Sequence, residues 1–386
     1  MAEYLNNIDF RESTCFHSQK GQNEKFGGFD FLRAIFAISI VAIHSNLFLT
    51  TKNLKIGSIS TSDILSANLA YLAVPVFFNI SLFLFYIKSE KMGHSYFFQK
   101  RLPKIFSLYL FWVISKIVFD IILKGKSEAL QNSTSSIKAF IEFIVSGGNS
   151  PLYFFFSLAF ITAISEFVVF LLRKIDNISL KNRFLYSSLL VSCVLVFMFS
   201  VLRLLDTSVE GTTGLIKSAS NFAKWAYNPL NFLPYIFTTA IVFEEFHAGQ
   251  FNEEFIFGIN KLKIKLCVLL SMFLMFSVLE WSFTNDLLNY SRLSLVFGSW
   301  LLLYLALLSA SKVPLIIQFI SGCSLGIYTF HLFFTHSLFT IYPNILTPLL
   351  RSSPILAVLL EFFVALTSSI LLTLLFRKFK LLKGFV

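Results

Sequence analysis

The sequence predicts an all-α polytopic membrane protein with about ten transmembrane helices and both termini in the cytoplasm. Hydrophobic residues make up 56% of the 386 residues and charged residues only 14%, whereas soluble domains contain about 25% charged residues. Apolar runs of about 20 residues, long enough for a helix to cross a bilayer, recur along the chain. Lys and Arg are distributed unevenly between the connections, as in membrane proteins with basic cytoplasmic loops.

The predicted membrane region covers residues 29–376, between a polar cytoplasmic tail (residues 1–28) and a basic cytoplasmic tail (residues 377–386). A ten-helix count gives the inner side a roughly two-to-one excess of Lys and Arg, and one helix more or fewer would place the basic tail outside. The predicted spans are residues 29–49, 67–87, 104–123, 151–172, 184–202, 229–246, 264–281, 292–311, 322–341 and 354–376.

The first span is apolar except for two informative groups, Arg33 and His44. A charged group near the middle of a membrane helix costs at least about 2.5 kcal/mol on insertion scales, and a simple anchor does not need one. The two residues are eleven positions apart, which is about three turns and roughly 16 Å along one helix face. They are either a functional cation and imidazole, or a snorkelling Arg and a His bonded to a neighbouring helix.

The second span contains Pro75, followed by Asn79 and Ser81. Pro bends a helix and frees a backbone carbonyl, so Asn79 and Ser81 are candidates for the wall of a cavity at the bend. The same three residues equally suit simple packing between helices.

A basic cluster of Lys100, Arg101 and Lys104 precedes the third span on the predicted cytoplasmic side. Topology alone favours positive residues there, and the same residues would suit a phosphate-rich ligand. Within the third span Lys116 and Asp120 are four residues apart, so we expect them to form a structural ion pair.

The ninth span places Ser324, Tyr328 and His331 at positions i, i+4 and i+7, on one helix face. Three hydrogen-bonding side chains on one stripe of an apolar helix should point into protein or water rather than lipid. We therefore expect this face and the Arg33–His44 face to line one shared cavity. On the predicted boundaries, His44 would lie further toward the outside than His331 by about 9 Å.

Neither a disulfide framework nor a metal site is predicted, because the four Cys residues show no paired spacing. Glu244, Glu245 and His247 resemble a metal cluster only faintly, since no second ligand motif accompanies them. The formal net charge of +11 fits basic cytoplasmic loops, so no nucleic-acid partner is expected.

The Arg33–His44 spacing resembles acyltransferase family 3, the integral membrane proteins that O-acylate bacterial surface sugars. The preceding aromatic-Asp-aromatic-Leu run (residues 29–32) and the Ser324, Tyr328 and His331 pattern fit this family as well. The chain departs from the usual pattern in three places: it has Ala34 after the Arg, Asn79-Ile80-Ser81 where Ser-Gly is usual, and Lys104 where Arg is usual.

The resemblance implies acyl transfer from cytoplasmic acyl-CoA, with acetyl-CoA as the expected donor, to a hydroxyl of an extracytoplasmic or lipid-linked glycan. It also implies a multi-pass protein of the bacterial inner membrane, in contact with lipid, that uses no metal. The implied catalytic residues are His44, Arg33 and His331; the implied donor-binding residues are Arg33, Lys100, Arg101, Lys104 and Tyr109; the implied cavity residues are Asn79, Ser81, Ser324 and Tyr328.

The chemistry agrees with these residue types, because a sugar hydroxyl must lose its proton as it attacks a thioester, and neutral His is the usual base. The sequence leaves open which His acts. It also leaves open two other classes of protein: a transporter or flippase for a lipid-linked polysaccharide, and a glycosyltransferase. Matching interrupted helices, expected of the former, and an Asp-x-Asp motif, expected of the latter, are not evident.

Overall fold

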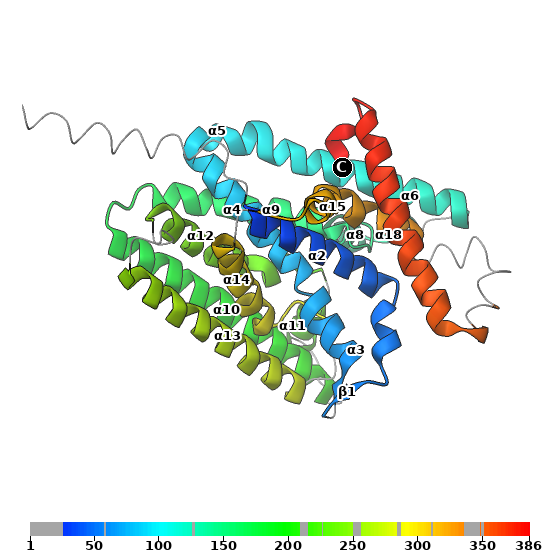
Figure 1. The fold of residues 1–386 in the computed structure, drawn as a ribbon, viewed down its shortest axis with the longest axis horizontal. Helices are drawn as coiled ribbons and strands as arrows, with labels where there is room; N and C mark the ends of the chain where they lie inside the picture. Colours follow the sequence, from blue (N-terminus) through cyan, green and yellow to red (C-terminus); the bar gives the residue numbers. More distant parts are fainter. Residues whose placement is uncertain are drawn as a thin grey trace, which may run out of the picture.

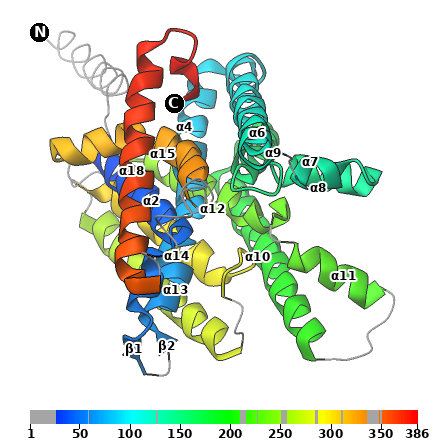
Figure 2. The same ribbon diagram turned by 90° about the vertical axis from the view of Figure 1, so that its right-hand side faces the viewer.

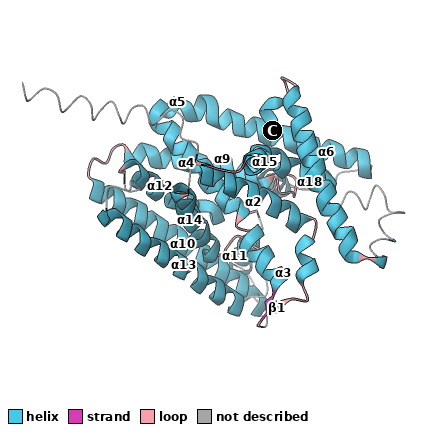
Figure 3. Ribbon diagram, viewed as in Figure 1, coloured by secondary structure: helices cyan, strands magenta, loops and turns pink. Residues whose placement is uncertain are grey.

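A computed structural model describes residues 26–57, 59–125, 128–208, 215–225, 227–249, 256–283, 287–309, 312–335, 348 and 351–386. These residues are almost wholly helical (Figure 3). Each predicted span contains one helix: α2 (Gly27–His44), α4 (Ala73–Met92), α6 (Leu102–Lys124), α9 (Tyr153–Leu172), α10 (Ile178–Ser208), α12 (Leu233–His247), α13 (Ile256–Phe283), α14 (Leu293–Leu308), α15 (Leu315–Phe334) and α18 (Pro354–Lys378).

Within the described residues, eight helical segments are long and apolar enough to cross a membrane. The other two predicted spans form shorter helices, α12 with 15 residues and α14 with 16 residues. The chain is therefore an all-α multi-pass membrane protein. The count of ten and the cytoplasmic placement of both termini stay predictions.

Short elements connect these helices, and α7 and α8 project to one side of the bundle (Figure 2). The sheet is a single antiparallel pair in which Lys55 faces Ser60. The connecting elements are η2 (Leu47–Thr51), β1 (Lys55–Ile56), β2 (Ile59–Ser60), α3 (Thr61–Ile64), η3 (Leu65–Ala70), α5 (His94–Tyr96), η4 (Phe97–Arg101), α7 (Glu128–Ser133), α8 (Ile137–Val145), α11 (Leu215–Lys224), η5 (Pro229–Phe232) and η6 (Lys383–Phe385).

Helix α2 lies at the centre of the bundle, in contact with α4, α14, α15 and α18 (Figure 1). One of its faces, with Phe29 and Phe36, joins the main apolar core. A second face, with Ala37 and Val41, packs against buried residues of α15 and α18. Small residues on a membrane helix let neighbouring backbones approach closely, which explains how one helix can contact four others.

Two glycines mark the closest approaches around this centre. A Cβ at Gly28 would lie 2.1 Å from the Ala306 carbonyl oxygen, so α2 meets α14 where only Gly fits. A Cβ at Gly326 would lie 1.9 Å from Thr373 Oγ1, which fixes α15 against α18. Helix α15 also packs directly along α2, and this contact sets the position of Tyr328 and His331 relative to the first span.

Several predicted boundaries differ from the observed helices, and three of the differences affect the site. Helix α2 ends at His44 because Asn46 has a left-handed backbone (φ 60°), and the chain continues as the short helix η2. Helix α15 begins at Leu315, seven residues before the predicted start, directly after Pro314. The second span is interrupted by a turn just before α4, four residues from Pro75, because a proline ring clashes with the carbonyl four residues earlier.

Candidate functional site

A cavity of about 760 Å³ opens between α2, α4, α6, α9 and α15, and we call it the inner cavity. Four cationic side chains lie in its described wall, Arg33, Lys88, Arg101 and Lys104, together with the carboxylate of Asp30. The rest of the wall is mostly apolar or aromatic. A pocket with an excess of positive charge beside apolar surface suits an anionic ligand that also has an uncharged part.

Each helix presents one regular face to the inner cavity. From α4 the lining residues are Phe77, Ser81, Leu84 and Lys88, which repeat at helical spacing. From η4 and α6 they include Arg101, Lys104 and Leu108, again on one face.

The guanidinium groups of Arg101 and Arg33, which both line the inner cavity, differ in their hydrogen bonds. The Arg101 guanidinium donates through Nη2 to the side chain and backbone carbonyl of Ser81, while its buried Nε has no partner among the described residues. No hydrogen bond or ion pair joins the Arg33 guanidinium to another described residue. Asp30, one turn before Arg33, instead accepts a 2.6 Å hydrogen bond from Ser321. Arg33 therefore keeps its donors available to a ligand.

Three residues that the sequence assigned to the site do not line the inner cavity. Lys100 is exposed to solvent on a different face from Arg101. Tyr109 is buried and donates its hydroxyl proton to the Ile144 carbonyl at the end of α8. Asn79 accepts a 3.0 Å hydrogen bond from Thr239, which ties α4 to α12. Asn79 lies about 100° from the nearest cavity-facing residue of α4, so helical periodicity explains its absence from the wall. Lys100 and Tyr109 are each four residues from a lining residue, so periodicity does not exclude them: Lys100 is exposed, and Tyr109 is bonded to Ile144 instead.

Ser324 and Tyr328 line the inner cavity as the sequence predicts. Tyr328 also borders a second cavity of about 220 Å³, the outer cavity, whose wall includes His44. The Tyr328 hydroxyl donates to the carbonyl of Pro151. The ring of Tyr328 therefore stands between the two cavities. The first and ninth spans pack side by side, but their polar residues are divided between two cavities instead of lining the single one that the sequence predicted.

His44 and His331 are neighbours, with ring centroids 5.1 Å apart. The predicted offset of about 9 Å between them is wrong, because α15 starts and ends seven residues earlier than predicted and carries His331 near its C-terminal end. His331 is fully buried, so it does not face lipid. His44 is half-buried and lines the outer cavity, whereas His331 lies behind it and lines neither cavity.

The tautomer of neutral His331 follows from its contacts. Nδ1 lies 3.1 Å from the Ile327 carbonyl oxygen, and a carbonyl only accepts hydrogen bonds, so Nδ1 carries the proton. Nε2 then holds the lone pair, and it has no hydrogen-bond partner among the described residues. The ring is thus fixed in one orientation beside His44.

The sequence interpretation missed Asp30 and Lys88 as cavity residues. Lys88 lies seven positions after Ser81 and Asp30 three positions before Arg33, so helical periodicity from the predicted site residues would have found both. It also missed Arg292, which was counted only as an outer-loop cation. Arg292 is 1% exposed and all its N–H groups are bonded, to Glu280, Ala67, Leu287, Asn68 and Ser294.

Replacing Arg292 by Leu is expected to lower the stability of the whole bundle. The Arg292–Glu280 pair is 2.8 Å long and buried, and removing one partner of a buried pair costs about 3–5 kcal/mol because the other charge stays unpaired. Thermal unfolding in detergent micelles measures the change. The control is Lys138→Gln, since the Lys138–Glu142 pair is exposed and such pairs contribute about 0.3–0.5 kcal/mol. Equal unfolding temperatures for the two variants would contradict a structural role for Arg292.

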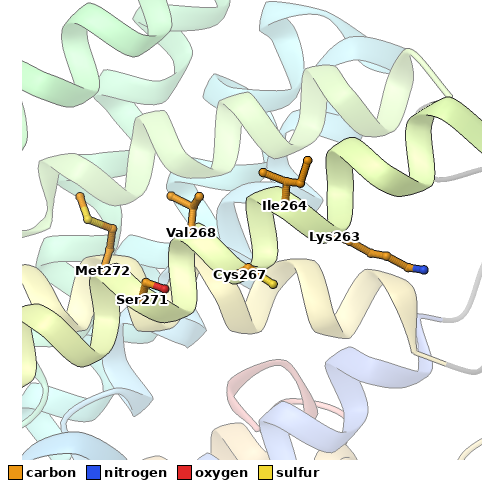
Figure 4. Close-up of a pocket in the computed structure, with 6 residues that line it drawn as sticks. All are labelled: Lys263, Ile264, Cys267, Val268, Ser271 and Met272. Carbon is orange, nitrogen blue, oxygen red and sulfur yellow. The ribbon is translucent and has the colours of Figure 1, made fainter.

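A further hollow lies on the surface of α13, where one helix supplies Lys263, Ile264, Cys267, Val268, Ser271 and Met272 (Figure 4). Only 11% of the apolar window of this helix is buried, as expected of a helix that faces lipid. The hollow is lined by one helix alone, and no second described segment brings a polar group to Lys263, Cys267 or Ser271 there, so the candidate site is the pair of cavities joined at Tyr328.

Residues 26–377 match the family model described as an acyltransferase domain, so the chain belongs to acyltransferase family 3. The protein is therefore a multi-pass membrane acyltransferase. No curated protein and no solved structure matches the chain. Membership of this family favours an enzyme over a transporter or flippase, and the particular donor and acceptor have to be inferred from the two cavities.

Proposed function

We propose that the protein transfers an acyl group, with acetyl as the expected one, from cytoplasmic acyl-CoA to a hydroxyl of an extracytoplasmic or lipid-linked glycan. The observation that supports this most is the contrast between two adjoining cavities. The inner cavity is cationic, and the outer cavity contains an imidazole. The bacterial inner membrane is the proposed location, because there a cytoplasmic donor can meet an acceptor on the other side.

The inner cavity is the proposed donor site. Arg33, Arg101 and Lys104 offer charge-assisted hydrogen bonds to the phosphates of CoA, and Arg can hold a phosphate through two donors. The apolar wall between these residues and Tyr328 suits the uncharged pantetheine arm. Arg33 and His44 are roughly 16 Å apart along α2, so such an arm would bring a thioester from the cations toward the imidazole. Lys100 and Tyr109 have no part in this donor site.

His44 is the proposed general base. The acceptor oxygen attacks the thioester carbonyl carbon, a C–O bond forms, the C–S bond breaks, and the hydroxyl proton passes to the imidazole before it reaches the departing thiolate. His44 lines the outer cavity, where an acceptor can approach it. His331 acts as a positioning residue, because its ring is fixed by Ile327 and lies against His44.

Consumption of acetyl-CoA tests the proposed function directly. Purified protein in liposomes, supplied with acetyl-CoA and an extract of surface glycan precursors, should release free CoA thiol and acetylate the glycan, as measured by mass spectrometry. A transporter would move the glycan without consuming thioester. Absence of thiol release from a correctly inserted protein, with every acceptor fraction, would refute the proposal.

Lys104 and Lys100 provide a matched pair for the donor site. Both are exposed lysines in the same basic cluster, but only Lys104 lines the inner cavity. We expect Lys104→Ala to raise the donor KM by about three- to tenfold with little change in kcat, the pattern of a lost binding contact. Lys100→Ala should leave both constants unchanged. If both variants change only the amount or orientation of inserted protein, the cluster serves topology and not donor binding.

A further inference from the structure

The outer cavity has an unusual wall of phenol rings. Five tyrosines from five separate segments border it, namely Tyr71, Tyr153, Tyr227, Tyr290 and Tyr328. The ring centroids of Tyr71 and Tyr290 are 5.0 Å apart, and those of Tyr153 and Tyr227 are 4.9 Å apart. Rings at these distances support one another and form a continuous aromatic surface. Of these tyrosines, only Tyr328 is among the site residues predicted from the sequence.

Backbone contacts and buried neighbours hold this surface in place. The Tyr71 hydroxyl donates a 2.9 Å hydrogen bond to the Leu288 carbonyl, and the Tyr328 hydroxyl donates to Pro151. Arg292 binds the carbonyl of Leu287, in the same segment as Tyr290. A site whose side chains are fixed in advance loses little conformational entropy when a ligand binds.

The described wall of the outer cavity contains no carboxylate, Lys or Arg, whereas that of the inner cavity contains four cations and Asp30. Burial raises the pKa of the Tyr227 and Tyr290 phenols above the ordinary value, so both stay neutral and keep their protons as donors. A charged group placed in this cavity would lose its hydration and find no Lys, Arg or carboxylate in the described wall to pair with, at a cost in free energy. The cavity is therefore suited to an uncharged ligand with hydroxyl groups.

The size of the outer cavity limits how much of a ligand can enter it. Its volume of about 220 Å³ is below the roughly 300–1,000 Å³ of pockets for drug-sized ligands, so it holds one small ring rather than a chain of rings. Tyrosine side chains offer flat apolar faces and phenolic hydroxyls together. A pyranose ring has the matching character, with C–H groups on its faces and hydroxyls around its edge.

We propose that the outer cavity binds one uncharged sugar ring of the acceptor, held against the tyrosine rings, with the hydroxyl to be acylated beside His44. This inference rests on the proposed function and narrows its acceptor. The acylated unit is a neutral monosaccharide residue, and uronic acids or phosphorylated sugars occupy other positions of the glycan.

Binding without any acyl donor tests the inference. The full chain in nanodiscs is titrated with two neutral probes, methyl glucoside and methyl N-acetylglucosaminide, and with one anionic probe, methyl glucuronide. Saturation-transfer NMR measures the binding of each probe. We expect at least one neutral probe to bind and the anionic probe to bind at least tenfold more weakly. Equal binding of methyl glucuronide would overturn the inference. Binding of decanol without binding of either neutral sugar would also overturn it and would assign the cavity to an alkyl chain.

Variants of Tyr227 locate the binding. This residue is only partly buried, so its replacement leaves the core intact. We expect Tyr227→Leu to weaken sugar binding about tenfold, as loss of one aromatic contact does, and Tyr227→Phe to weaken it less. The control is Tyr186→Leu, which changes a 43% exposed tyrosine on α10 that borders neither cavity. If Tyr227→Leu binds the neutral probes as the control does, the inference is wrong.

The two proposals fail in different ways in these experiments. If the protein consumes thioester and the Tyr227→Leu variant binds sugar as the wild type does, the proposed acceptor site is wrong and the acyltransfer reaction stands. Tyr227-dependent sugar binding by a protein that never consumes acyl-CoA would overturn the donor assignment and leave the sugar site in place.

Discussion

Replacing His44 by Ala is expected to reduce acyl transfer by about 10²–10⁴-fold, the usual contribution of a general base. The residue is half-buried, lines the outer cavity and lies at the end of α2, so the variant should insert and fold normally. Steady-state acetyl transfer in liposomes measures kcat, while donor binding without acceptor should stay within a few-fold of the wild type. A loss confined to kcat is expected because the base acts in the transition state.

His247→Ala is the matched control for His44→Ala. It removes an imidazole from the inner end of α12, where it is 65% exposed and 3.1 Å from Glu90, outside both cavities. His331→Gln provides a second comparison. We expect its loss of activity to be smaller than that of His44→Ala, because His331 lines neither cavity. Normal activity of a folded His44→Ala protein would exclude His44 as the base.

Replacing Arg33 by Gln is expected to raise the donor KM by about tenfold to a hundredfold. Hydrogen bonds to a charged group contribute about 1.5–3 kcal/mol, and about 1.4 kcal/mol corresponds to a factor of ten. The Arg33 guanidinium makes no hydrogen bond to a described residue, so its replacement breaks no hydrogen bond within the part of the chain that the structure describes. Initial rates at varied acetyl-CoA concentrations give the donor KM.

Arg33→Lys should recover part of the affinity, because Lys keeps the charge but loses the planar fork that matches phosphate. Lys174→Gln is the control for charge alone, since it removes an exposed cation that follows α9 and lies over the ring of Phe170. If Arg33→Gln binds the donor normally but does not insert, the Arg serves only to anchor the first span.

The apolar runs were sufficient to predict the class of fold, because a bilayer requires helices of about 20 residues that satisfy their own backbone hydrogen bonds. The shared face of Arg33 and His44 and the stripe of Ser324 and Tyr328 followed from the helical period. The Lys116–Asp120 ion pair, at 2.6 Å, is confirmed for the same reason. Local period and local hydropathy are properties of the chain, and no contact with another segment is needed to establish them.

The depth of His331 depended on where α15 begins, and hydropathy does not fix this point when apolar residues continue on both sides of it. The predicted start missed Pro314, so the ring was placed too far from His44. The face that each helix turns to the cavity also needed the neighbouring helices. Lys88 lines the inner cavity, whereas Lys100, Tyr109 and Asn79 do not. Asn79 is bonded to Thr239 of α12 and Tyr109 to Ile144 of α8, and these are contacts between segments that the local sequence does not indicate.

The wall of the outer cavity was decided by tertiary structure alone. Its five tyrosines come from segments that are separated by up to about two hundred and fifty residues, and only Tyr328 was assigned to the site from the sequence. The buried network around Arg292 is of the same kind, since it joins residues 67–68 to residues 280–294. Sequence alone determined that this chain crosses the membrane as helices and carries cations and imidazoles within them. Which of these groups meet was settled by close packing. Helix α2 meets the backbone of α14 at Gly28 and α15 meets the Thr373 side chain of α18 at Gly326, and such contacts fix the relative positions of whole helices.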